Sequence, residues 1–228
     1  IGRTLSSNYK PLYEQLKSYN PDDIAREYRV ISKQSLESIS AGEADVFTTI
    51  SDLIAEECSH FLKKKVDSIL PNGFESSFIL EEQDLRERRE NAREKMLSVA
   101  SKLISESLPD NSFIVATSGR YEFKNKGIDL FIDVIHSLRN IELERPVIAF
   151  LFNPTNNYGA RKDLLQALEN NQNLTEGSNM VTHYLHDAEL DPILKKIKEY
   201  GFSNKDPKVK LIYVPAFLNG NDGIFDLS

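Results

Sequence analysis

The sequence predicts an α/β protein built on parallel sheets, because two separate stretches alternate between strand-like and helix-like patterns. Between residues 46 and 70, a β-branched run, a helical segment and a short apolar run follow one another. From residue 112 onward the alternation begins again, and its run 147–152 is apolar at every position. Strand–helix–strand units imply parallel pairing, and a continuously apolar strand is typical of a sheet that is covered on both faces.

The first long helix is predicted to start at Asn20. An asparagine side chain can cap free amide groups, Pro21 suits the first helical position, and Asp22 and Asp23 lie near the positive end of the helix dipole. Apolar residues then recur at mostly helical spacing. We therefore expect one helix that runs to about Ala41.

A strand–helix–strand unit follows this helix. The run 46–50 is rich in β-branched residues and predicts a strand, and Ser51 can cap the next helix. Lysines occupy positions 63–65 at the C-terminal end of that helix, where its dipole favours cations. The run 68–70 predicts a second strand, which ends at the turn Pro71-Asn72-Gly73.

The segment from Glu81 to Leu108 is densely charged, and it predicts an amphipathic helix. Its apolar residues repeat at helical spacing, and Glu82 and Arg86 can pair across one turn. The repeating apolar positions are Leu85, Ala92, Met96, Val99 and Leu103. We interpret the charges as a solvated face, and a docking surface is the functional alternative.

The second module begins after the break at Pro109-Asp110-Asn111. Strands are predicted at 112–117, 147–152 and 209–214, and helices at 128–138, 161–170 and 191–200. We expect the helix 128–138 to bury Phe131, Val134, Ile135 and Leu138. The chain therefore divides into an α/β module over residues 1–80, a connecting helix over 81–110 and a second α/β module over 111–228.

The composition excludes several classes of protein. The chain has 228 residues, of which 40% are hydrophobic and 28% charged, an ordinary globular balance. Its single cysteine, Cys58, rules out an internal disulfide, and no apolar run reaches the roughly 18–20 residues of a membrane-spanning helix. A net charge of −7 argues against nucleic acid as a partner. With no leader pattern at the start, we expect a cytoplasmic protein that has no membrane partner.

The stretch 119–127, Gly-Arg-Tyr-Glu-Phe-Lys-Asn-Lys-Gly, has the features of a ligand-binding loop. It joins a predicted strand to a predicted helix, and open parallel sheets bind ligands at the carboxyl ends of their strands. Its cations and the free amide groups of the following helix suit a diphosphate, and its two terminal glycines permit close approach. On spacing alone a solvated connector is the alternative, because neither common phosphate-loop pattern is present.

This loop, together with residues 41–51 and the turn 71–73, resembles glycogen synthases of glycosyltransferase family 3, the fungal and animal type. Gly2-Arg3 is similar to the end of that family's H-A-T-x-x-G-R segment. The segments Asp191-Pro192-Ile193-Leu194 and Val214-Pro215-Ala216-Phe217-Leu218 also fit the family's order. The resemblance extends through essentially the whole chain, and the loop 119–127 is its most specific motif.

The resemblance implies a GT-B-like fold, in which two Rossmann-like domains enclose the active site. It implies a retaining glucosyltransferase that moves glucose from a nucleotide sugar, UDP-glucose rather than ADP-glucose, to the non-reducing end of an α-1,4-glucan. The family's donor-phosphate positions map onto Arg120 and Lys126 in the loop that Gly119 opens, and onto Arg3. These cations would carry the catalysis without a metal or other cofactor, because they neutralise the departing diphosphate.

The chain also departs from the family's full pattern. This sequence begins after the position of the family's histidine, which precedes Gly2. It also ends before the family's E-P-W-G-Y-T-P-x-E segment, which in the family follows the strand that here ends at Val214. We therefore expect parts of two sheets, both truncated, and no transferase activity from this polypeptide alone. Exposed strand edges and uncovered apolar faces predict self-association as a homo-oligomer.

Several other residues have a functional and a structural interpretation. His183 and His186 are spaced as on one helical turn and could ligate a metal, but no third ligand accompanies them, so a structural or solvent-exposed role is favoured. Cys58 fits a small core residue better than a nucleophile. Asn72 is explained by its tight turn, and Tyr121 either packs the loop or flanks a ligand.

Two alternative functions stay open at this stage. One is another retaining glucosyltransferase that uses a nucleotide sugar. The other is a non-catalytic module that binds a nucleotide or a partner protein, with the charged helix from Glu81 as the contact surface.

Overall fold

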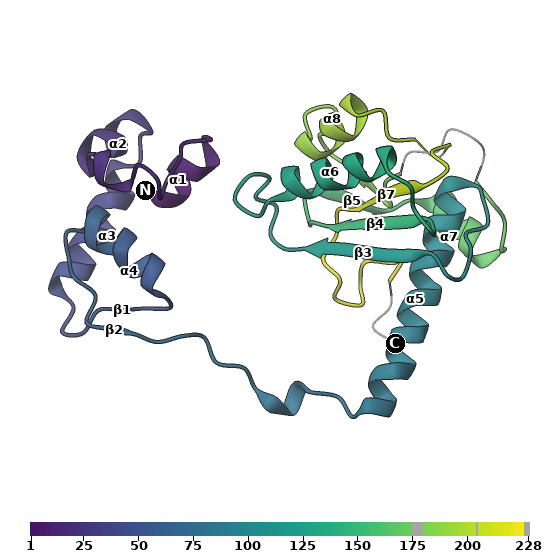
Figure 1. Ribbon diagram of the computed structural model, residues 1–228, viewed down its shortest axis with the longest axis horizontal. Helices are drawn as coiled ribbons and strands as arrows, with labels where there is room; N and C mark the ends of the chain where they lie inside the picture. Colours follow the sequence, from purple (N-terminus) through teal and green to yellow (C-terminus); the bar gives the residue numbers. More distant parts are fainter. Residues whose placement is uncertain (175–179, 204, 226–228) are drawn as a thin grey trace. The chain divides into compact units, whose positions relative to one another are not determined.

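The structure, a computed structural model, describes residues 1–174, 180–203 and 205–225. The chain divides into two compact units, Ile1–Ile79 and Leu80–Ser228 (Figure 1). Each unit has its own elements and its own apolar core, and the two are described separately below.

The first unit consists of short helices around a small parallel sheet. Its elements are α1 (Gly2–Ser7), η1 (Leu16–Ser18), α2 (Pro21–Glu27), α3 (Ile31–Glu43), β1 (Thr48–Thr49), α4 (Asp52–Phe61), β2 (Ser68–Ile69) and η2 (Ser76–Phe78). β1 and β2 pair in parallel, which confirms the expected strand–helix–strand unit, although both strands are shorter than predicted. The core of the unit is formed by Leu5, Leu12, Leu16 and Phe61.

The predicted helix caps of this unit are present. Asn20 accepts hydrogen bonds from the amides of Asp22 and Asp23 at 2.9 and 3.2 Å, with Pro21 at the first helical position. Ser51 caps α4 by accepting from the amide of Ile54 at 3.3 Å. Both helices therefore begin where a capping side chain, recognisable in the sequence, accepts from free backbone amides.

The prediction of one helix from Asn20 to Ala41 is wrong, because the chain breaks it into α2 and α3. Arg29 adopts a left-handed backbone conformation with φ of 56°, and the amide of Val30 bonds back to the carbonyl of Ala25 at 2.8 Å. This is a helix-ending turn in which a non-glycine residue takes the left-handed position. No glycine or proline stands at this turn, and the apolar spacing continues across it, so the sequence pattern predicted one continuous helix.

The second unit holds the larger sheet. Its elements are α5 (Glu82–Ile104), β3 (Phe113–Ser118), α6 (Ile128–Ser137), η3 (Leu138–Asn140), β4 (Val147–Phe152), β5 (Asn157–Ala160), α7 (Lys162–Glu169), β6 (His183–Leu185), α8 (Pro192–Glu199) and β7 (Val209–Val214). β3, β4 and β7 pair in parallel in that order, each pair over six residues. The pattern analysis did not predict β5 and β6, which pair antiparallel.

Helices cover both faces of this sheet (Figure 1). On one face Ile148 and Phe150 of β4 pack with residues of α5 and α7. On the other face Ala149 and Leu151 pack with residues of α6 and α8. The continuously apolar run 147–152 is buried for that reason, which confirms the α/β class with parallel sheets and a Rossmann-type arrangement.

Two helix details differ from the sequence analysis. α6 buries Ile128, Ile132 and Ile135, whereas Val134, expected on the buried face, is 50% exposed. α5 ends at Ile104 rather than Leu108, and only its C-terminal half is buried. None of the helices in the described part of the chain is long and apolar enough to cross a membrane.

Candidate functional site

The carboxyl ends of β3, β4 and β7 bring together segments that are far apart in the sequence. Asn153, which follows β4, donates from Nδ2 to the carbonyl of Gly119, which follows β3, at 3.1 Å. Asn157 donates to the carbonyl of Pro215, which follows β7, at 2.8 Å, and the amide of Thr155 donates to the same carbonyl at 3.3 Å. The loop 119–127 therefore lies at the edge of the sheet where parallel folds bind ligands.

This loop, the basic loop, is built from successive turns. The amide of Lys126 bonds to the carbonyl of Glu122 at 2.9 Å, and the amide of Gly127 bonds to that of Lys124 at 3.0 Å. Gly127 lies immediately before α6 in a left-handed conformation with φ of 63°, which favours glycine. The loop thus leads directly into the positive end of the α6 dipole.

The cations of the basic loop differ in their surroundings. Lys124 pairs with Asp129 of α6 at 2.6 Å, so its charge has a nearby carboxylate. Lys126 is exposed to solvent. The Arg120 side chain is 72% exposed, and its Nε lies 3.3 Å from Oε1 of Glu122. Arg120 and Lys126 are therefore the members of the loop most open to an incoming anion.

Glu122 lies beside Arg120 inside the loop. Its side chain is only 11% exposed, and its Oε2 accepts a hydrogen bond from Asn125 Nδ2 at 3.2 Å. The ion pair to Arg120 uses Nε, whereas bidentate phosphate binding uses further nitrogens of the guanidinium fork. The ion pair therefore leaves nitrogens of the arginine open to a phosphate.

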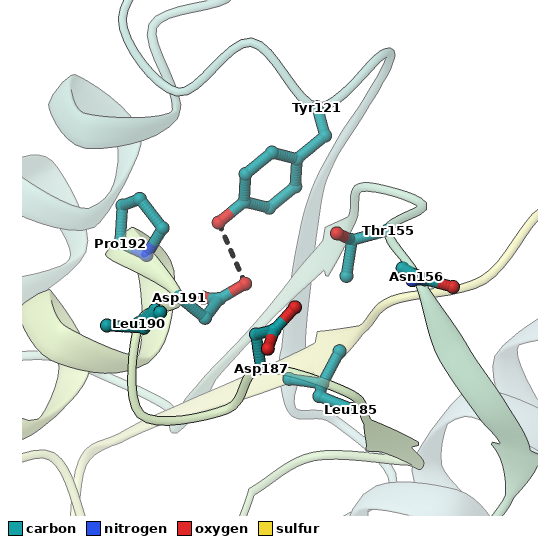
Figure 2. A pocket seen from close by; sticks show the side chains of 8 residues that line it. All are labelled: Tyr121, Thr155, Asn156, Leu185, Asp187, Leu190, Asp191 and Pro192. Atoms are coloured by element: carbon teal, nitrogen blue, oxygen red, sulfur yellow. Dashed lines mark hydrogen bonds between the residues drawn. The ribbon is translucent and has the colours of Figure 1, made fainter.

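Tyr121 ties the basic loop to the residue that caps α8. Its hydroxyl donates to Asp191 Oδ2 at 2.8 Å (Figure 2). Tyr213 of β7 donates to the same oxygen at 3.4 Å. Asp191 also caps α8 by accepting from the amide of Leu194 at 2.9 Å. Burial, and next the nearby Asp191 carboxylate, raises the pKa of both tyrosines, so their hydroxyls stay protonated as donors.

A small cavity lies beside this tether. It has a volume of about 190 Å³. Figure 2 shows its lining, which comes from the basic loop, the β4–β5 connection, the end of β6 and the segment that leads into α8: Tyr121, Thr155, Asn156, Leu185, Asp187, Leu190, Asp191 and Pro192. A second, more open hollow of about 450 Å³ lies along α5 and is lined by Arg86, Arg89 and Arg93 among others.

His183 and His186 do not lie on one helical turn. His183 lies in β6, not on a helical turn as the spacing suggested, and its Nε2 contacts the carbonyl of Asp222 at 2.9 Å. His186 is exposed and lies against Tyr158, with ring centroids 3.6 Å apart and the ring planes tilted by 41°. Within the described ranges, no three His, Cys, Asp or Glu side chains are grouped to hold a metal ion.

The remaining candidates lie in the first unit. Arg3 is exposed on α1 of the first unit. Cys58 is half-buried in α4, where burial raises the pKa of its thiol, as expected of a packing residue rather than a nucleophile. Asn72 is exposed in a connection without regular structure.

Pattern analysis did not single out Asp191 or Asn153. Asp191 precedes a proline at a helix start, which is a cap signal, but its partner Tyr121 is seventy residues earlier. Asn153 directly follows the apolar run 147–152, and a polar residue at that point of a parallel strand is a usable signal. It is buried, and among the described residues its Oδ1 has no hydrogen-bond partner.

Comparisons with known proteins agree with the resemblance. The family model described as glycogen synthase matches residues 1–177. A glycogen [starch] synthase of Neurospora crassa is 30% identical over 161 residues, covering 68% of this chain and 23% of the relative. Glycogen [starch] synthase isoform 2 of Saccharomyces cerevisiae is 26% identical over 294 residues, covering all of this chain and 42% of the relative.

The liver glycogen [starch] synthase of Rattus norvegicus is 24% identical over 283 residues, covering all of this chain and 40% of the relative. The chain thus spans less than half the length of these curated relatives. The family model covers more than half of the chain and includes the whole basic loop. The chain therefore belongs to the glycogen synthase family.

Proposed function

We propose that this chain carries part of the donor site of a retaining glucosyltransferase. The reaction would transfer glucose from a nucleotide sugar, UDP-glucose rather than ADP-glucose, to the non-reducing end of an α-1,4-glucan. The observation that carries the proposal is the basic loop at the carboxyl end of β3, with Arg120 exposed and Gly127 leading into α6. Membership of the glycogen synthase family supports the choice of donor and acceptor.

In this proposal the basic loop binds the diphosphate and stabilises it as it leaves. Arg120 and Lys126 contact phosphate oxygens, and Gly119 allows the chain to turn from β3 into the loop. At an effective dielectric of about 20 and a separation of about 4 Å, one cation–phosphate contact contributes about 4 kcal/mol before desolvation is subtracted. Negative charge grows on the diphosphate as the glycosidic bond breaks, so positioned cations lower the barrier.

Arg3 is proposed as a third cation at the donor site, brought there in the folded enzyme. The sequence resemblance supports this role. We also propose that the protein works in the cytoplasm without a metal, and that it self-associates. We further propose that the 228-residue polypeptide by itself does not extend a glucan, which a transfer assay with labelled UDP-glucose and glycogen tests.

The central test is calorimetric titration of UDP and ADP into the full-length protein and into its single variants. We expect Arg120→Ala and Lys126→Ala each to weaken UDP binding at least tenfold. The matched control is Lys124→Ala, which removes the same charge from the same loop at a residue that Asp129 already pairs. UDP affinity that Arg120→Ala leaves unchanged would contradict the proposal, as would an equal loss in the control.

A further inference from the structure

Tyr121 adjoins Arg120 in the basic loop, and its side chain is attached to another part of the unit. The Tyr121 ring packs on the same apolar cluster as α6 and α8, and its hydroxyl donates to Asp191 Oδ2 at 2.8 Å. The contact joins residues seventy positions apart. Phe123 also packs on this cluster and Lys124 pairs with Asp129 of α6, but the Tyr121 contact fastens the loop at the residue next to Arg120.

Asp191 is a rigid anchor for this contact. It is 8% exposed, its Oδ1 accepts from the amide of Leu194, and its Oδ2 accepts from both tyrosine hydroxyls. Tyr213 is fully buried in β7 and approaches the same oxygen from the sheet at 3.4 Å. The shorter contact from the Leu194 amide fixes the carboxylate at the start of α8, so the loop joins an anchor that does not depend on the Tyr213 hydroxyl.

We propose that Tyr121 and Asp191 are a positioning pair that holds Arg120 in the geometry that receives the donor diphosphate. The inference rests on the proposed function, because it takes Arg120 to be a phosphate ligand. The pair contacts neither phosphate nor sugar and acts through Arg120. A displacement of about 1 Å at a group that must meet a ligand costs large factors in affinity or rate, so a tether at the adjacent residue controls that contact.

Tyr121→Phe is the decisive variant because it removes the hydroxyl and keeps the packed ring. Tyr213→Phe is its matched control, since it removes a hydroxyl from the same Asp191 oxygen but belongs to β7 rather than to the loop. Both substitutions are made in the full-length protein, and UDP binding is measured by calorimetry. We expect Tyr121→Phe to weaken UDP about tenfold and Tyr213→Phe to change it less than twofold.

A double variant separates positioning from a general loss of structure. If Tyr121 acts through Arg120, then Tyr121→Phe added to Arg120→Ala weakens UDP binding by less than twofold further, because the effects are not additive. Additive losses, or equal losses in Tyr121→Phe and Tyr213→Phe, would overturn the positioning role.

The same titrations separate this inference from the proposed function. Weaker UDP binding in Arg120→Ala with unchanged binding in Tyr121→Phe overturns the positioning pair and leaves the donor site standing. Unchanged binding in Arg120→Ala overturns both. Where the enzyme turns over, the donor KM is expected to rise in Tyr121→Phe while the KM for glycogen stays constant, which a merely structural defect would not produce.

Discussion

Replacing Asp191 with alanine tests how much this residue, which anchors the basic loop, contributes to the free energy of unfolding. The change removes three accepted hydrogen bonds, from the Leu194 amide and from the hydroxyls of Tyr121 and Tyr213. Loss of the helix cap costs about 1 kcal/mol. Tyr213 is fully buried, so its hydroxyl left without an acceptor costs about 1–3 kcal/mol.

The Tyr121 hydroxyl faces the cavity of about 190 Å³, where water can replace the carboxylate, so its loss adds less than about 1 kcal/mol. Together these contributions predict a loss of about 2–5 kcal/mol in the free energy of unfolding. For a unit of this size that corresponds to a fall in Tm of about 10 °C. Asp191→Asn keeps a good cap and an acceptor oxygen, so we expect it to cost about 1–2 kcal/mol.

Urea unfolding followed by far-ultraviolet circular dichroism measures these losses. Asp187→Ala is the control, because Asp187 is an exposed carboxylate on the wall of the same cavity and should cost less than about 0.5 kcal/mol. If Asp191→Ala destabilised the protein no more than Asp187→Ala does, Asp191 could not be the anchor of the loop and of α8.

Two further predictions concern the backbone and the pH response. Gly127→Ala is expected to lower the free energy of unfolding by about 1 kcal/mol, because φ of 63° strains any residue with a Cβ although the space around it is open. The control is Gly42→Ala, inside α3 with equally open space, which should not destabilise the protein. An equal effect of both substitutions would contradict the backbone explanation. Burial lowers the pKa of His183 in the folded protein below its value of about 6.5 in the unfolded chain. Below that pH the unfolded chain therefore binds more protons than the folded protein does. The stability that neutral His183 contributes at pH 7 is lost as the pH falls through and below about 6.5. In urea melts at pH 7 and pH 5.5, His183→Gln should therefore lose less stability between the two conditions than the unmodified protein does, and equal losses would refute the assignment.

Much of the fold was predictable because its signals are local. The run 147–152 is apolar throughout, and the structure buries it between two helical layers with the predicted bounds. Asn20 and Ser51 cap helices as their positions indicate. The break at Arg29 was not predictable in the same way, because a left-handed arginine carries no composition signal.

The site was predictable in part, for a related reason. A run of cations between a strand and a helix is visible in the sequence, and the structure has that loop between β3 and α6. Which cations have carboxylate partners was not visible, since the pairing of Lys124 with Asp129 and of Arg120 with Glu122 depends on how the turns fold. The roles of Arg3, Arg120 and Lys126 stay predictions until binding is measured.

The sequence by itself determined the α/β class, the parallel pairing and the family, because periodicity, caps and a specific nine-residue motif are properties of neighbouring residues. Only the tertiary structure decided that Tyr121 reaches Asp191 and that Asn153 holds Gly119. Those contacts join residues separated by seventy and by thirty-four positions, and they exist because parallel strands deliver their carboxyl ends to one edge of a sheet. No local pattern encodes which side chains meet there.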